Sequence, residues 1–140
     1  MLVFQRQAVE LSKSESDPYR QLLGAHQLDL ADVYLKLSAY EQAARIALEI
    51  PTTVPNSSRA EGCLDAARLL ARLVTRLSAD QKIAQAKRDR LARGYLARIV
   101  VLLREVIDTD PRLAEQIKTD HHIKLLKSRP EFQAMMNLML

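Results

Sequence analysis

The sequence predicts an all-α protein, built as a right-handed stack of antiparallel helix pairs. Only three Gly and five Pro occur in 140 residues, which leaves room for long helices. Hydrophobic residues make up 48% of the chain but aromatic residues only 4%, and there is no Trp. A core of Leu, Ala, Ile and Val without aromatics favours helix-on-helix packing over a β-sandwich. The length is that of one domain, which we assign to residues 1–140.

The strongest helix signal lies between Ala25 and Pro51. Large, small and aromatic residues recur there at helical spacing, namely Leu30, Ala31, Tyr34, Tyr40, Ala43 and Ala47. The small side chains at positions 43 and 47 let a second helix approach closely. This pattern is typical of a tetratricopeptide-type (TPR-like) helical repeat, a class that binds partners and seldom carries chemistry.

A first helix pair is predicted over residues 17–51. Asp17 and Pro18 mark a helix start, with Asp17 as the N-cap and Pro18 in the first helical position. The helix runs to about residue 37, and its expected buried face consists of Leu22, Leu23, His26, Leu30, Val33, Tyr34 and Leu37. Ser38 and Glu41 predict a capping box for the second helix, which ends before Pro51. A further short helix is predicted over residues 3–11.

A second, longer pair is predicted over residues 58–108. Ser57 or Ser58 caps its first helix, whose buried face consists of Cys63, Leu64, Ala67, Leu70, Ala71, Val74 and Leu77. Residues 110–140 form C-terminal capping helices, because Asp110-Pro111, Thr119-Asp120 and Pro130 each mark a helix start. The last helix carries Phe132, Met135, Met136 and Met139. We interpret it as cover for the last repeat; a docking strip for a partner helix is the alternative.

The net charge of +4 is unevenly distributed along the chain. Residues 1–58 carry −2, residues 59–104 carry +7 and residues 105–140 carry −1. Arg68, Arg72 and Arg76 recur every four residues in the basic segment and line one helix face. A groove for nucleic acid or a phosphorylated peptide is one interpretation. We favour a solvated helix face, because no aromatic side chain is interleaved to stack on bases.

The composition also bears on the compartment. The single Cys63 excludes an intramolecular disulfide and fits a reducing environment. The longest apolar run, residues 99–103, is far shorter than the roughly 20 residues that span a bilayer. Residues 1–10 lack the continuous apolar run of a signal peptide. We therefore expect a cytoplasmic protein without a membrane segment.

Few side chains are candidates for chemistry, and we predict neither a catalytic, cofactor or metal site nor an enzyme. Cys63 lies on an apolar helix face with no base near it in sequence, which predicts an inert core thiol. His121 and His122 have no second pair of ligands at metal spacing, so they predict a turn or helix cap. His26 lies on the expected apolar face, which predicts a half-buried, hydrogen-bonded ring.

Three blocks of residues have an order and spacing found in a known family. The first is Ala31-Asp32-Val33-Tyr34-Leu35-Lys36-Leu37, followed by Tyr40 and Ala43-Ala44. The second is Ala66-Ala67-Arg68-Leu69-Leu70-Ala71-Arg72, followed by Arg88, Leu91-Ala92, Tyr95 and Leu102-Leu103-Arg104. The third is Lys118-Thr119-Asp120, then Leu125-Leu126, then Ser128-Arg129-Pro130-Glu131-Phe132-Gln133. From about residue 19 onward, the chain thereby resembles the C-terminal TPR-type tail of large bacterial serine/threonine protein kinases.

The resemblance implies a non-catalytic tail. A kinase domain needs a glycine-rich phosphate loop, a strand lysine, a catalytic loop and a metal-binding Asp-Phe-Gly motif, and this sequence contains none of them. Its glycines, Gly24, Gly62 and Gly94, are too far apart to form a phosphate-binding loop.

The expected function is a non-catalytic protein–protein interaction scaffold. In a helical repeat of this type, the first helix of each pair lines a concave surface. The expected contacts to the partner are the polar residues Asp29, Asp32, Lys36, Arg68, Arg72 and Arg76 on these helices. The partner is a protein or peptide of unknown identity, and nucleic acid is disfavoured. The alternative is a regulatory or recruitment tail of a kinase whose catalytic domain is absent here. Repeat ends without caps tend to self-associate, which leaves a weak homodimer open.

Overall fold

The computed structural model describes residues 17–139. Seven α-helices and one 3₁₀ turn account for most of this range, and no strand occurs within it. They are α2 (Asp17–Lys36), α3 (Tyr40–Thr53), η1 (Asn56–Ser58), α4 (Arg59–Ala79), α5 (Gln85–Thr109), α6 (Pro111–Thr119), α7 (His121–Leu126) and α8 (Pro130–Met139). The predicted all-α class is confirmed. The short helix predicted over residues 3–11 lies outside the described residues.

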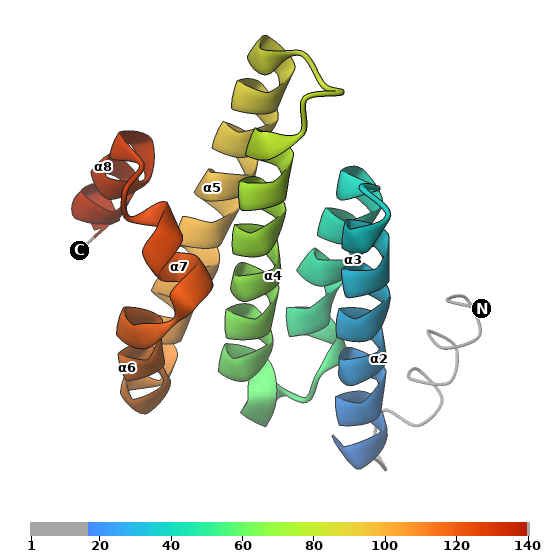
Figure 1. Ribbon diagram of the computed structural model, residues 1–140. Coiled ribbons are helices and arrows are strands. Elements are labelled where there is room, and N and C mark those ends of the chain that lie inside the picture. The colour runs from blue at the N-terminus through green and yellow to red at the C-terminus, as the bar shows by residue number, and fades with distance from the viewer. Residues whose placement is uncertain (1–16, 140) are drawn as a thin grey trace.

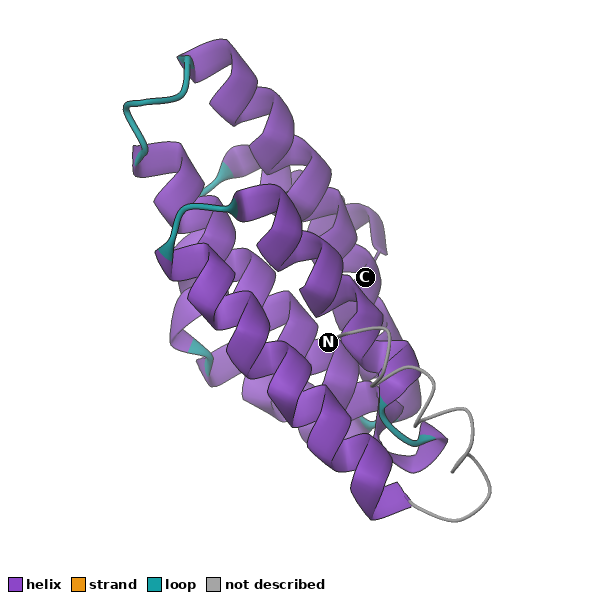
Figure 2. Cartoon of the chain, turned by 90° about the vertical axis from the view of Figure 1, so that its right-hand side faces the viewer, coloured by secondary structure: helices purple, strands orange, loops and turns teal. Residues whose placement is uncertain are grey.

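The four long helices lie side by side in chain order, and the three short C-terminal helices cover the far side (Figure 1). Helix α4 packs against α3 on one side and α5 on the other, and α2 packs against α3 and the edge of α4. Helix α7 contacts α4, whereas α6 and α8 contact mainly α5. Short loops connect the helices throughout (Figure 2). Helix α4 therefore contacts both α2 and α7, which brings the three helices together on one face.

The core is centred on α4, whose predicted apolar face is fully buried. Further buried residues on the same helix include Ala66, Leu69 and Leu73, so α4 is covered on more than one side. Ala43 and Ala47 on α3 are also fully buried. Small side chains let helix axes approach closely, which is the role that the sequence pattern predicts for these two alanines.

The predicted buried face of α2 is only partly correct, because the observed buried face is rotated about the helix axis. Leu23 is buried as predicted, and Leu30 and Tyr34 are half-buried against the core. Leu23, Gly24, Gln27, Ala31 and Leu35 are buried. By contrast, Leu22, Val33 and Leu37 are 52%, 50% and 70% exposed, and His26 is exposed as well. The reason is the size of the contact residues. A Cβ added at Gly24 would clash with Cγ1 of Val54, so the segment that follows α3 approaches α2 at its small residues rather than at its large ones.

Two of the predicted N-caps are confirmed, and one is wrong. Asp110 accepts hydrogen bonds from the backbone of Arg112 and Leu113, and Asp120 accepts one from Ile123, as the Asp-Pro and Thr-Asp signals predict. The capping box at Ser38 is wrong. Ser38 has a φ of 60°, and the backbone bonds from Ser38 and Ala39 close the end of α2 in a Schellman motif.

Two other boundaries differ from the prediction, and one predicted cap lacks its hydrogen bond. Asp17 is itself helical in α2 rather than the cap that precedes the helix. Helix α3 includes Pro51 and continues to Thr53, because a proline in the last turn removes only one backbone donor. Ser58 is the N-cap residue of α4, but its side chain makes no capping hydrogen bond to that helix.

Candidate functional site

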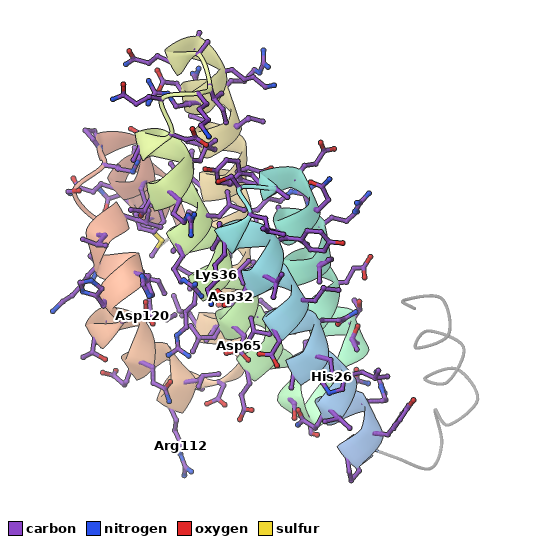
Figure 3. The ribbon with its side chains drawn as sticks, turned by 45° about the vertical axis from the view of Figure 1, so that its right-hand side comes forward. His26, Asp32, Lys36, Asp65, Arg112 and Asp120 are labelled. Carbon is purple, nitrogen blue, oxygen red and sulfur yellow. The ribbon has the colours of Figure 1, made fainter. Side chains whose placement is uncertain are left out.

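A groove of about 310 Å³ lies where α2, α4 and α7 meet. It is lined by Leu28, Asp29, Asp32, Asp65, Arg68, Leu69, Arg72 and His122. Four of the six residues expected to contact a partner are among them: Asp29, Asp32, Arg68 and Arg72. Figure 3 shows Asp32 and Lys36 on α2, Asp65 on α4 and Asp120 at the start of α7. The groove is therefore rich in charge and built from three helices.

On the α2 side of the groove, Asp32 is the centre of a three-residue ion pair network. Arg72 on α4 donates to Asp32, and Lys36 Nζ lies 3.0 Å from its second carboxylate oxygen. Hydrogen bonds from Lys36 and Arg72 lower the pKa of Asp32 below its ordinary value. Arg76 donates to the backbone oxygen of Lys36 at 3.4 Å, so it lies beside the end of α2. The expected contact residues Lys36 and Arg76 thus lie outside the groove lining itself.

On the opposite side, Arg68 connects α4 to the C-terminal helices. Its Nε lies 2.6 Å from Oδ2 of Asp120, whose side chain is only 10% exposed. Its Nη2 donates to Gln116 at 3.2 Å. Asp120 is also the N-cap of α7. Arg72 thus fixes α4 against α2, and Arg68 fixes it against the start of α7.

Two carboxylates of the groove are much less well paired. Asp65 has Arg68 Nη1 at 3.8 Å as its ion pair, but Arg68 is already bonded to Asp120. Burial of the Asp65 carboxyl raises its pKa above the ordinary value, despite the nearby arginine. Asp29 is exposed and forms no ion pair within residues 17–139. Asp65 is not among the residues expected to contact a partner, although its position three residues before Arg68 places it on the same helix face.

His122 completes the lining from α7. Desolvation lowers the pKa of its imidazole, and the nearby Arg72, His121 and Arg68 lower it further against the opposing effect of Asp120. The ring is therefore neutral at pH 7. It packs edge-on against His121, with ring centroids 5.5 Å apart. In the described part of the chain, no three His, Cys, Asp or Glu side chains lie close enough together to hold a metal ion.

Cys63 lies in a separate polar cluster between α4 and α5. Its thiol donates to Oε2 of Glu105 at 2.7 Å, and Arg59 Nε lies 2.8 Å from the same oxygen. Burial, followed by Glu105, raises the pKa of the Cys63 thiol to about 12. The thiol therefore stays protonated at neutral pH, as expected of an inert core residue. Sequence reasoning missed Glu105, because the contact depends on the packing of two helices.

A larger, apolar groove of about 640 Å³ lies among the C-terminal helices. Its lining includes Ile107, Ile117, Ile123, Phe132 and Met136. Phe132 is buried, and Met135 and Met136 are half-buried against the core. Helix α8 packs on α5 through these residues.

No protein-family model, curated protein or solved structure matches the chain. Over residues 17–139, no helix is long and apolar enough to cross a bilayer.

Proposed function

We propose that the chain is a non-catalytic protein–protein interaction scaffold of the TPR-like class, and that the groove between α2, α4 and α7 binds a peptide segment of its partner. The observation that carries this proposal is the groove itself, where charged side chains from α2 and α4 and the His122 ring from α7 surround the apolar Leu28 and Leu69. A polypeptide offers the complementary groups, because its backbone donates and accepts hydrogen bonds and its side chains carry both charges.

The helix arrangement supports the TPR-like part of the proposal. Helices α2 and α3 form one pair and α4 and α5 form the next; α6 and α7 follow, with α6 mainly against α5 and α7 against α4. In a TPR-like stack, the first helix of each pair lines the binding surface. Helices α2 and α4 hold the corresponding positions here.

The ion pairs make the groove suitable for binding. Asp32 holds Arg72, and Asp120 holds Arg68, so the walls of the groove are fixed before a ligand arrives. A site whose side chains are already ordered loses less conformational entropy on binding. We expect these arginines to position the walls, while the less constrained groups make contact with the partner.

A pull-down from nuclease-treated lysate, using the 140-residue chain as bait at low and high salt, tests this function. The informative variant is Asp29→Arg, because Asp29 lines the groove and is exposed. Asp89→Arg is the matched control, since Asp89 is an exposed acid on α5 outside the groove. A partner retained at both salts by wild type and by the control, but lost with Asp29→Arg, supports the proposal. A partner bound equally by all three proteins contradicts it.

The three sequence blocks support a narrower second proposal, a recruitment tail attached to a serine/threonine kinase. The third block has a clear role in this chain, because Arg129 donates to Ser78 at the end of α4 at 2.7 Å and Phe132 is buried. Reading the natural gene upstream of residue 1 tests the attachment. A kinase domain in the same frame supports it, and a stop codon directly upstream contradicts it.

A further inference from the structure

The cations of the groove are already neutralised by the protein itself. Arg72 is bonded to Asp32, and Arg68 is bonded to Asp120 and Gln116. His122 is neutral at pH 7 because its pKa is lowered. An incoming anion would have to displace Asp120, whose side chain is 10% exposed, or Asp32 from its two partners. Although the arginine pattern in the sequence suggests an anion site, these contacts disfavour one.

The acids of the groove are in excess. Asp29, Asp32 and Asp65 face two arginines and a neutral histidine in the lining, within a chain whose net charge is +4. Asp32 is satisfied by its own partners, which leaves Asp29 on α2 and Asp65 on α4. The Asp65 side chain is 42% exposed, so a ligand can reach it, and its nearest cation lies at 3.8 Å. The groove lining therefore carries one more negative than positive charge, and a bound cation would balance it.

We infer that the partner segment recognised in this groove carries a lysine or arginine side chain, whose cationic group is bound by Asp65 and Asp29. The inference rests on the proposed function and specifies the chemistry of the partner. Leu28 and Leu69, which line the same groove, suit the methylene stem of such a side chain. A charge-assisted hydrogen bond to a half-buried carboxylate is stronger than one at an open surface.

The burial of Asp65 supports this assignment independently of the charge count. A carboxylate whose ionised form is disfavoured by its surroundings lowers the stability of the folded chain. Residues of this kind, located in a groove, are typical of functional sites, where stability is lost in favour of binding. A bound cation would relieve the unfavourable environment of Asp65.

The test uses a positional-scanning library of synthetic eight-residue peptides, with each amino acid fixed in turn at each position. The full chain is compared with the double variant Asp29→Asn/Asp65→Asn and with the control Asp89→Asn. We expect sublibraries with fixed Lys or Arg at one position to bind best. The double variant should bind the selected peptide at least about tenfold more weakly, because both carboxylates that bind the cation lose their charge. The control should bind it as wild type does.

Three results would overturn the inference. Selection of peptides with Asp, Glu or neutral residues at every position would show that the groove binds a segment of different chemistry. Equal affinity of wild type and the double variant for a basic peptide would place that peptide elsewhere on the surface. If no sublibrary binds above background, the proposed peptide-binding function fails, and the inference fails with it. Thermal unfolding of each variant confirms that the proteins compared are folded.

Discussion

Asp65 is the residue in which stability and binding conflict most directly. Its carboxyl is partly buried between α2 and α4, and its one cation is shared with Asp120. Burial raises the pKa of Asp65, so the folded protein binds a proton at this site more tightly than the unfolded chain does. The sign follows from linkage: the ionised Asp65 destabilises the fold above the raised pKa, and this cost disappears below the unfolded value near pH 4.

Replacement of Asp65 by asparagine should therefore stabilise the protein at pH 7. The expected gain in the free energy of unfolding is below about 1 kcal/mol, because water screens a side chain that is 42% exposed. The gain should vanish as the pH falls through about 4, where wild type is also neutral at this position. Urea unfolding at pH 7 and pH 4 measures both effects. An Asp65→Asn protein that is less stable than wild type at pH 7 would contradict this account.

At the scale of helices, close approach through small residues decides which faces are buried. Gly24 on α2 faces Val54, which is 6% exposed and follows α3. A methyl group at position 24 would overlap Cγ1 of Val54. The β-branched Val54 cannot turn aside easily, because few rotamers are open to it in a packed site. Gly94 on α5 differs, since nothing lies within 4 Å of its added Cβ.

The two glycines should respond with opposite signs to replacement by alanine. Gly24→Ala should lower the free energy of unfolding by about 1–3 kcal/mol through overpacking. Gly94→Ala should raise it by about 0.5–1 kcal/mol, since alanine is the better helix former at an exposed interior position. Denaturant titration measures both. In addition, Gly24→Ala/Val54→Ala should recover part of the loss, and a Gly24→Ala variant as stable as wild type would disprove the close contact.

Ion pairs between helices also act at this scale. Arg68 ties α4 to the N-cap of α7, with its Nε 2.6 Å from Asp120. Arg68→Met should cost about 1–2 kcal/mol of unfolding free energy, because it leaves a largely buried carboxylate without its cation. Lys118→Met is the control: Lys118 and its partner Glu115 are both 71% exposed, so the change should stay within about 0.5 kcal/mol. Equal losses in the two variants would show that Arg68 does not brace the helices.

Local signals account for the elements that the sequence predicts well. Asp110 and Asp120 cap their helices by accepting hydrogen bonds from backbone N–H groups two or three residues further on. Such caps depend on the local sequence alone, so the sequence predicts them. The capping box predicted at Ser38 is wrong because a polar residue between two helices can either end the first or begin the second, and Ser38 ends α2. The rotation of α2 was beyond sequence reasoning, because the exposed Leu22 and Val33 are more apolar than the buried Gln27 and Ala31. Only the position of α3 and its following segment decides between them.

For the whole molecule, the site was partly predictable. The helix period places Asp29 and Asp32 on α2, and Arg68 and Arg72 on α4, at positions that meet in one groove. The pairing of these charges could not be predicted, since Arg68 and Asp120 lie 52 residues apart in sequence. Whether an arginine is open to a ligand or used within the fold depends on such distant contacts. Because both arginines are used within the fold, the partner chemistry inferred from the groove is basic rather than the anionic chemistry that an open arginine face would bind.

The arrangement of the stack also predicts how local stability varies through the molecule. Helix α4 is packed on both sides and carries most of the fully buried leucines, whereas α8 packs mainly on α5 at one end. Local opening takes place where few buried contacts must be broken. Backbone amides of α4 should therefore exchange with solvent most slowly, and those of α8 should exchange much faster, through opening of the C-terminal end alone.

Phe132→Ala provides the decisive comparison for this gradient. Phe132 is 1% exposed and holds α8 to the core, so its truncation should accelerate hydrogen exchange in α8 strongly. If α8 opens by itself, the slowest amides of α4 should change much less, since they exchange only when the whole stack unfolds. Exchange measured by NMR or mass spectrometry follows both helices in one experiment. Equal acceleration in α4 and α8 would instead mean that the end and the centre of the stack unfold as a single cooperative unit.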